Sequence, residues 1–506
     1  MKVCVIGSGI AGLTSAAYLV KNGHEVTIFE QYNHIGGVTA SFEKDGYKWD
    51  LGQLLIEGIG AGEPAGDVLK ELGVLDQIEV IKDDRTYIFP DFEIKKPEKY
   101  EGIKWRMDKL RELFPEDAKG LSKYWKYYLR FMKLMTIARK MEKEKGIRKF
   151  GYNISLLLTL FPLITKKNWS AQKLMDHLFK SKKLQSIFIS ILADFFVKPT
   201  QFIGLGVFAL NPEPFYDKRM PKKLTKKSEH LHLFNVLGGM SSLIDALSII
   251  IQQKGGKILT NSLVSKILVE NNKITGLQTD NGQTHPADLI IASGGAKETF
   301  LKLIGKDFLP TEFLESVENI SLMDSIFMVH LGVDYNPALY LSEVCTYYYG
   351  TYDIEKGVER CRKGFYHEGA DGFVVHVPSF HSPSMAPPDH NAITIYTICP
   401  DSLKEGNWGE KKEGYADKLL EYAEKRIPNL RDHIKTKIIM TPEDFRKRTN
   451  LDHHAFGGIA PIMGKQGIPH KTPIENLWFV GAQSESGGGV NAVILSIYRM
   501  MKKFKI

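Results

Sequence analysis

The residues best suited to bind a ligand lie at the start of the chain, in a glycine-rich turn followed by an acidic residue. Gly7, Gly9 and Gly12 form a GxGxxG pattern, and Glu30 follows its last glycine by 18 residues. In this pattern the first glycine permits a tight turn, the second lets a diphosphate approach the backbone, and the third allows a helix to pack closely on a strand. An acid at this distance accepts hydrogen bonds from a ribose diol. The spacing therefore predicts a dinucleotide site.

The flanking residues predict the strand–helix–strand unit that such a turn requires. Residues 3–6 (VCVI) form a short apolar run typical of a buried parallel strand. Apolar residues then recur at helical spacing until Gly23, and residues 26–29 predict a second strand that ends at Glu30. The N-terminus of the predicted helix offers free N–H groups and a partial positive charge to phosphates.

A second glycine pair indicates which dinucleotide binds. Gly36 and Gly37 are followed by Val38 and Thr39, and Gly52 comes soon after. This continuation resembles flavoproteins in which a Gly-Gly pair after the acid lies near the FAD diphosphate, so FAD is expected rather than NAD. An arginine usually follows the pair in those proteins, whereas this chain has Val38.

The end of the chain carries a second strand–glycine–helix unit. Residues 476–480 predict a strand, Gly481 and Ala482 follow it, and Gly489, Val490 and Asn491 open the last predicted helix. We expect the N-terminus of this helix to face the pyrimidine carbonyl of a flavin and to stabilise negative charge there. Both ends of the chain would then close one FAD site. The predicted cofactor-binding residues are Gly7, Ser8, Gly9, Ile10, Ala11, Gly12, Glu30, Gln31, Gly36, Gly37, Val38, Thr39, Gly52, Val264, Gly481, Ala482, Gly489, Val490 and Asn491.

Few side chains are candidates for catalysis. The sequence contains no Ser/His/Asp motif, no HExxH and no P-loop, and no metal site is predicted. Glu57 is a weak candidate for reaching the reactive side of a flavin. His454 is a weak candidate for a proton donor. His453 precedes it, and neighbouring residues on a strand point to opposite faces, so the two imidazoles would not serve one site.

Composition is that of an ordered globular protein, but its charge is unevenly distributed. The 506 residues carry a net charge of +8, and residues 91–230 contain 31 Lys and Arg against 15 Asp and Glu. A surplus of this kind favours an anionic partner surface. No finger, RRM or helix-turn-helix pattern accompanies it, so nucleic acid is not expected.

The basic region also contains short apolar segments. A helix predicted over residues 120–146 carries a lysine and arginine stripe and a separate apolar stripe of Trp125, Leu129 and Met132. The apolar runs 154–164 and 187–196 follow it. An ordinary solvated helix face is one interpretation. Peripheral binding to an anionic bilayer is the favoured one. No apolar run reaches the ~20 residues of a membrane-spanning helix. The N-terminus leads directly into the nucleotide fold and Cys4 lies in a strand, so we expect a cytoplasmic location.

The fold class expected is α/β, with a Rossmann-like FAD-binding domain of the two-dinucleotide type, an antiparallel-sheet substrate domain and a helical, basic, membrane-facing insertion. The predicted domain boundaries are 1–90, 231–298 and 442–506 for the FAD-binding domain, 91–230 for the insertion and 299–441 for the substrate domain.

These motifs together resemble the phytoene desaturase, carotenoid isomerase and retinol saturase family within the amine-oxidase superfamily. The segments that carry the resemblance are Gly7–Glu30, Gly36-Gly37, Trp49–Gly52, Leu237–Leu243, Ala287–Ala292, Ser382–Pro387, Thr441–Phe445 and Gly481–Ser496. The resemblance implies an enzyme that draws a long isoprenoid from the bilayer and exchanges hydride between its C–C bonds and the flavin N5. It also implies that the antiparallel sheet walls the substrate chamber and that backbone near Val264 meets the adenine.

Two alternatives remain open at this stage. A flavin amine oxidase would carry the same glycine-rich ends. A lipid carrier similar to the Rab GDP-dissociation inhibitors would share the fold without using flavin, although such a carrier has no need of Glu30 as a ribose acid. The oligomeric state does not follow from the sequence.

Overall fold

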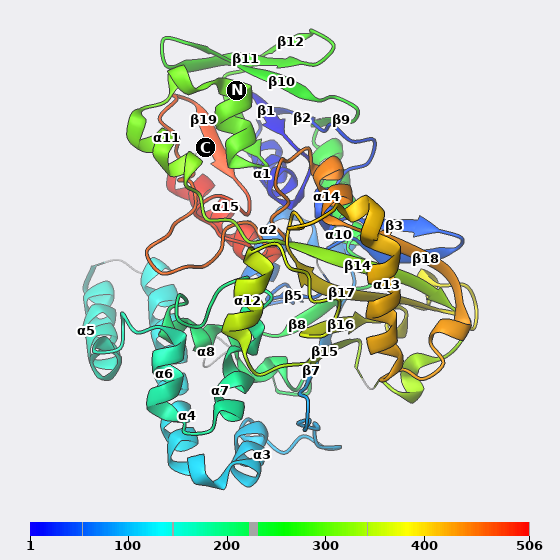
Figure 1. Ribbon diagram of the computed structural model, residues 1–506. Helices are drawn as coiled ribbons and strands as arrows, with labels where there is room; N and C mark the ends of the chain where they lie inside the picture. The colour runs from blue at the N-terminus through cyan, green and yellow to red at the C-terminus, as the bar shows by residue number, and fades with distance from the viewer. Residues whose placement is uncertain (53, 144–145, 222–230, 342, 505–506) are drawn as a thin grey trace.

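A computed structural model describes residues 1–52, 54–143, 146–221, 231–341 and 343–504. Figure 1 shows an upper lobe that holds both ends of the chain and a lower lobe built from a large sheet and a group of helices. The last residues of the predicted insertion, 222–230, lie outside the described residues.

A five-stranded parallel sheet forms the centre of the upper lobe, in the order β19-β13-β1-β2-β9. Its strands are β1 (Lys2–Ile6), β2 (Glu25–Phe29), β9 (Lys257–Leu259), β13 (Leu289–Ser293) and β19 (Leu477–Val480). The sheet therefore collects strands from the beginning, the middle and the end of the chain. Helices α1 (Ile10–Lys21), α2 (Pro64–Leu72), α10 (Ser241–Gln253) and α15 (Val490–Phe504) pack together through a shared apolar core.

A six-stranded sheet dominates the lower lobe, in the order β18-β14-β17-β16-β15-β7. Its strands are β7 (Arg85–Ile88), β14 (Ser325–Val333), β15 (Cys345–Tyr349), β16 (Gly372–His376), β17 (Asn391–Cys399) and β18 (Ile434–Met440). All neighbours are antiparallel except β7, which pairs in parallel with β15. The sheet is thus mixed, and its edge strand comes from the first ninety residues rather than from the predicted substrate domain.

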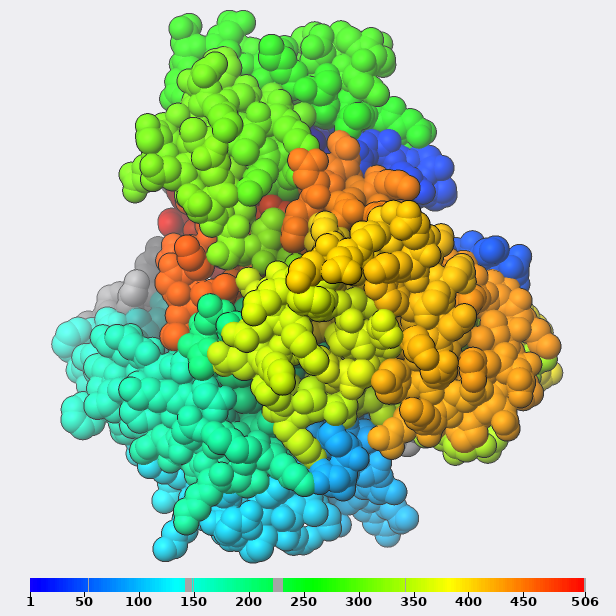
Figure 2. All heavy atoms as spheres, viewed as in Figure 1, coloured from blue at the N-terminus to red at the C-terminus, as the bar shows by residue number. Residues whose placement is uncertain are grey.

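Three smaller sheets hold the other strands of the described residues. They are the hairpin β3 (Ser41–Lys44) and β4 (Tyr47–Asp50), the trio β5 (Ile56–Glu57), β8 (Leu233–Val236) and β6 (Val80–Asp83), and the trio β10 (Val264–Glu270), β11 (Lys273–Thr279) and β12 (Thr284–Pro286). Helices α11 (Thr311–Glu318), α12 (Ile354–Arg362), α13 (Trp408–Glu424) and α14 (Pro442–Thr449) accompany the sheets. Figure 2 shows yellow and orange atoms from the six-stranded-sheet region covering the middle and right of one face.

The predicted basic insertion is helical. It contains α3 (Trp105–Leu113), α4 (Ala118–Lys143), α5 (Gly146–Ile164), α6 (Ala171–Leu178), α7 (Lys182–Ile189) and α8 (Val207–Leu210). Two details differ from the sequence prediction. Leu129, assigned to the apolar stripe of the long helix, is exposed, whereas Trp125 and Met132 are buried. The apolar run 187–196 lies mostly in the core, so it is not a membrane-dipping segment.

Candidate functional site

The two ends of the chain meet at one cavity of about 570 Å³. Its wall includes the start of α1, the start of α15, and residues of the lower sheet and the helical insertion. The sequence-predicted residues that line it are Ile10, Ala11, Val38, Thr39, Gly52, Gly481, Ala482, Gly489, Val490 and Asn491. Most of the other lining side chains are apolar or aromatic, so the cavity joins a glycine-rich end to an apolar interior.

The first glycine-rich turn has the geometry that its spacing predicts. Gly7 has a φ of +88°, and a Cβ at Gly12 would lie only 2.0 Å from the carbonyl oxygen of Gly7. Only glycine therefore fits at Gly12. By contrast, a Cβ at Gly9 would meet nothing within 4 Å, so open space lies beside the backbone at this turn. The first helical bond of α1 runs from Leu13 N to Gly9 O, which leaves the amides of residues 10–12 without a helical partner.

Glu30 lies beside this turn. Its Oε2 accepts hydrogen bonds from the backbone N (2.8 Å) and the Oγ (2.6 Å) of Ser8, and its Oε1 accepts one from the N of Tyr32 (2.9 Å). Ser262 N donates to the Glu30 carbonyl at 2.8 Å, so the segment that leads into Val264 is held next to the acid. These bonds fix a buried carboxylate at the end of β2, where a ribose could be bound.

The second glycine pair lies against the first turn. Gly36 forms a bridge with Gly9, and Gly37 is close enough that its Cβ would lie 3.4 Å from the Cα of Gly9. Arg448, from α14, donates from Nε to the Gly37 carbonyl at 2.9 Å and stacks over the ring of Tyr32. A guanidinium thus lies beside the pair, although the sequence has Val38 where an arginine was expected. Sequence spacing does not reveal this contact, because it joins residues 411 positions apart.

The N-terminus of α15 faces the cavity from the opposite direction. Its first helical bond runs from Val493 N to Gly489 O, so the amides of residues 490–492 have no helical partner. A Cβ at Gly489 would meet nothing within 4 Å, and the Oδ1 of Asn491 is buried without a hydrogen-bond partner among the described residues. An unsatisfied amide oxygen and three free amides therefore border open space.

Glu57 and His454, the two candidate catalytic residues, both line the cavity. Burial raises the pKa of Glu57, opposed by Arg85 and by a hydrogen bond from Asn491. The His454 ring bonds Ser325 Oγ through Nδ1 at 2.6 Å and stacks on Phe445, and burial lowers its pKa to about 3. The imidazole is therefore neutral near pH 7, which argues against a charged proton donor at His454.

His453 points elsewhere, as expected, although neither histidine lies in a strand. Its Nε2 lies 2.7 Å from the Met323 carbonyl oxygen, and it does not line the cavity. The stacking partner of His454 comes from the segment Thr441–Phe445, where Thr441 and Asp444 form a reciprocal cap at the start of α14. This segment thus positions an aromatic ring at the cavity wall.

The interior of the cavity holds charged groups that sequence reasoning missed. Arg85 and Asp194 line it, together with Cys345, Tyr347 and Tyr396. Burial raises the pKa of Asp194 to about 7, although Arg85 lowers it. A lone aspartate within the apolar run 187–196 was the available signal. No sequence motif indicated Arg85. It reaches the cavity through the pairing of β7 with β15, two strands that lie far apart in the chain.

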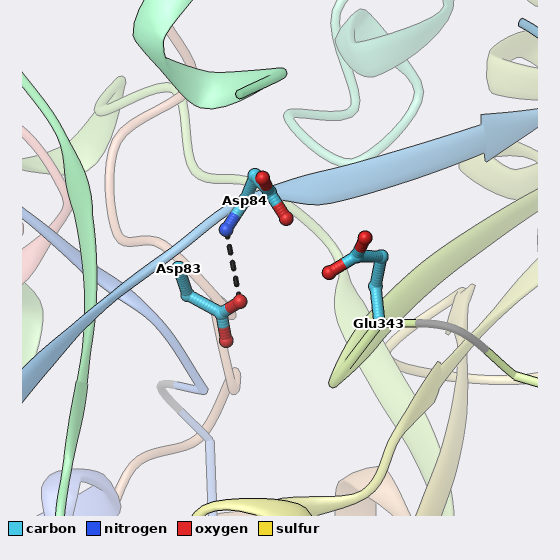
Figure 3. Close-up of side chains that lie close together, drawn as sticks. All are labelled: Asp83, Asp84 and Glu343. Carbon is cyan, nitrogen blue, oxygen red and sulfur yellow. Dashed lines mark hydrogen bonds between the residues drawn. The ribbon is translucent and has the colours of Figure 1, made fainter. Parts of the chain in front are cut away.

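A cluster of three buried carboxylates lies elsewhere (Figure 3). Asp83, Asp84 and Glu343 bring oxygen atoms within 4.8 Å of one another. Lys96 Nζ lies 2.8 Å from Asp84 Oδ2, and Lys218 Nζ lies 3.6 Å from Asp83 Oδ1 and 3.8 Å from Glu343 Oε2. These ammonium groups already supply positive charge to the cluster, so it is best described as an ion-pair network.

Comparisons with known proteins agree with this geometry. A sequence model of the family described as "Flavin containing amine oxidoreductase" matches residues 10–496. The chain is 26% identical to a 4,4'-diapolycopen-4-al dehydrogenase of Metabacillus indicus, over 98% of this chain and 95% of the relative. It is 25% identical to a chloroplastic prolycopene isomerase of an Oncidium hybrid cultivar, over 97% of this chain and 81% of the relative. An oxidoreductase from Methanosarcina mazei has a similar fold, with a TM-score of 0.66 at 20% identity over 99% of this chain and all of that one.

Proposed function

This chain belongs to the flavin-containing amine oxidoreductase family, and we propose that it is an FAD-dependent oxidoreductase that desaturates, saturates or isomerises C–C bonds of a long isoprenoid or carotenoid at a membrane surface. The observation that carries the proposal is the cavity, because it connects the glycine-rich turns at both ends of the chain to a mainly apolar interior. A long hydrocarbon requires such an interior, whereas a small polar substrate would leave it unfilled.

The residues fit FAD at both ends of the site. The open space beside Gly9 and the free amides of residues 10–12 suit a diphosphate, and Glu30 suits the ribose next to it. Arg448 would add positive charge on the diphosphate side. The free amides at the start of α15 and the unsatisfied Oδ1 of Asn491 suit the polar edge of an isoalloxazine ring.

When bound, FAD supplies hydride chemistry at its ring system. The residues of this protein then have three tasks, two carried out by side chains and one by backbone amides. The apolar lining binds and orients the chain of the substrate and excludes water. The amides at the start of α15 would favour electron density on a ring edge bound beside them. Glu57, whose pKa burial raises, holds a proton more firmly than an exposed glutamate and bonds Asn491, so it orients that amide at the cavity wall.

A surface suited to lipid supports the membrane part of the proposal. Helix α5 carries exposed apolar side chains at helical spacing, among them Leu157 (64% exposed) and Phe161 (75% exposed). Basic residues such as Arg148 and Lys167 are exposed at the two ends of this helix. Figure 1 shows α5 at the left margin of the molecule, away from the sheets. An apolar face flanked by positive charge suits the boundary of an anionic bilayer. Among the described residues, no helix is both long and apolar enough to cross a membrane.

Anaerobic mixing of the flavin-loaded protein with lipid-dispersed polyenes tests the enzymatic part. We expect a polyene hydrocarbon to bleach the flavin absorbance when it is oxidised, or reduced flavin to reoxidise when the polyene is saturated. For an isomerisation we expect chromatography to show a changed double-bond geometry without net flavin reduction. Hydrogen peroxide release with polyamines or aromatic amines, and no change with any polyene, would instead assign the chain to the amine oxidases.

Vesicle flotation tests the membrane part. The protein should float with vesicles that contain anionic lipid, and the bound fraction should fall as salt is raised from 0.05 to 0.5 M (roughly from 14 to 4 Å in Debye length). Neutral vesicles should retain less protein at every salt concentration. Equal binding to neutral and anionic vesicles, independent of salt, would contradict the proposal.

A further inference from the structure

We propose that Arg85 recognises the terminal carboxylate of the substrate, so that the ligand of the cavity is a long apolar chain that ends in an acid. This inference deepens the proposed function and rests on it. It narrows the substrate class from a hydrocarbon to a polyene or isoprenoid acid held by one end.

The hydrogen-bond donors of Arg85 are largely unsatisfied. Its Nη2 donates to the carbonyl oxygen of Leu210 at a long 3.4 Å, and its Nε is buried without a partner among the described residues. Arg85 forms no ion pair with any residue that the structure describes. The guanidinium instead lies over the rings of Tyr87, Phe215 and Tyr347, at 4.9–5.7 Å from their centroids.

Arg106, which is fully buried where Arg85 is only partly buried, shows how this chain compensates a guanidinium when only structure is required. Arg106 is 1% exposed and forms a two-bond contact with Glu213, from Nε at 3.2 Å and from Nη2 at 3.0 Å. Arg85 has no equivalent, although it lines the cavity and a ligand can therefore reach it. An uncompensated buried cation is costly, and a carboxylate that forms two parallel bonds is the partner that best matches a guanidinium.

Two acids share the cavity with Arg85, and both favour this assignment. Glu57 and Asp194 lie near enough for Arg85 to lower their pKa values, but burial raises both, in the case of Asp194 to about 7. Neither carboxylate forms an ion pair with Arg85 among the described residues, so the guanidinium remains available to a ligand. The guanidinium is also held in place by aromatic faces, which attract a cation without neutralising it.

The position of Arg85 sets the orientation of the ligand. Arg85 begins β7, an edge strand of the six-stranded sheet, which Figure 1 shows in the lower lobe, below α1. Apolar side chains such as Ile191 and Leu233 line the cavity along with it. A carboxylate at Arg85 would therefore place the unsaturated chain of the ligand along the apolar wall, toward the glycine-rich end.

Direct binding of a fluorescent polyene acid tests the inference. The FAD-loaded protein is titrated with cis-parinaric acid and, separately, with its methyl ester, and the ligand fluorescence gives both Kd values. We expect the acid to bind at least 10-fold more tightly than the ester. Arg85→Met should weaken binding of the acid by about 10- to 150-fold, the range for a lost charged hydrogen bond, and leave the affinity for the ester unchanged. Arg85→Lys should retain part of the preference.

Ile191→Val is the matched control, because it shortens an apolar lining side chain without changing charge, and it should weaken acid and ester by the same factor. Arg85→Gln serves if the methionine variant does not retain FAD. Equal affinities of acid and ester in the unmodified protein, or an acid preference that survives Arg85→Met and Arg85→Gln, would overturn the inference. In that case, flavin bleaching, flavin reoxidation or isomerisation with a polyene hydrocarbon would leave the proposed function standing. If no polyene changed the flavin or was itself changed, both the inference and the proposed function would be refuted.

Discussion

Replacing Arg448 tests whether the chain supplies from α14 the guanidinium that its glycine pair lacks. Arg448 lies beside Gly37, and Gly37 contacts the turn at Gly9 where the diphosphate of FAD is expected. Burial lowers the pKa of Arg448, but an arginine so placed stays charged at neutral pH. Removing one charge-assisted hydrogen bond to a phosphate costs about 1.5–3 kcal/mol, which corresponds to roughly a 10- to 150-fold weaker Kd.

The assay is a titration of FAD-free protein with FAD, in which quenching of the flavin fluorescence reports binding. Arg448→Met should weaken FAD by the factor above, and Arg448→Gln, which can still donate to the Gly37 carbonyl, should show how much of the loss is due to charge. Lys447→Met is the matched control, because it removes one positive charge from an exposed position of the same helix turn and should leave the Kd within about twofold. Adenosine, which has no diphosphate, should bind all variants equally. The reasoning would be refuted if Arg448→Met bound FAD as tightly as Lys447→Met does.

Three further predictions concern the membrane surface, the pH dependence and the core. The double variant Leu157→Ser/Phe161→Ser should lose most of its flotation with anionic vesicles. Its melting temperature should stay within a few degrees of that of the unmodified protein, because both side chains are exposed. Unchanged flotation would exclude α5 as the membrane-contacting helix. Burial raises the pKa of Asp194 from 3.8 to about 7, so the folded state holds this proton more tightly than the unfolded state does. Between pH 4 and 7 the free energy of unfolding should therefore fall, relative to that of Asp194→Asn, by at most ~1.4 kcal/mol per pH unit, and it should level off above pH 7. A difference between the two proteins that stays constant with pH in denaturant titrations would contradict the raised pKa. Glu213→Ala should lower the free energy of unfolding by about 3–5 kcal/mol because it leaves Arg106 buried without its partner, and a loss below about 1 kcal/mol in urea titrations would show that the ion pair is not needed.

Local spacing made the cofactor-binding half of the fold predictable. The tight turn at Gly7 and the close approach at Gly12 follow from the absence of a Cβ, so the GxGxxG pattern specifies a strand–turn–helix unit wherever apolar residues flank it correctly. The β-branched and aromatic runs at residues 325–333 and 372–376 form β14 and β16 for the same kind of reason, since breaks bound them on both sides.

The apolar run 187–196 shows where such reasoning fails. Its composition suited either a membrane surface or a protein core, and only the packing of α7 against α4 and the six-stranded sheet placed it in the core. Hydrophobicity measures the preference of a segment for an apolar environment, but it does not say which apolar environment is available.

The sequence by itself determined the glycine-rich turns, the acid that follows them and the basic character of the insertion, because each depends on neighbours a few residues apart. The tertiary structure alone decided that Arg448 lies beside Gly37, that Arg85 enters the cavity through the pairing of β7 with β15, and that Asp194 and Glu57 share that cavity with it. These contacts join segments that are far apart in the chain, and their existence depends on how the sheets and helices pack. Periodicity and spacing carry no information about that packing, so the polar groups of the interior became visible only in the folded chain.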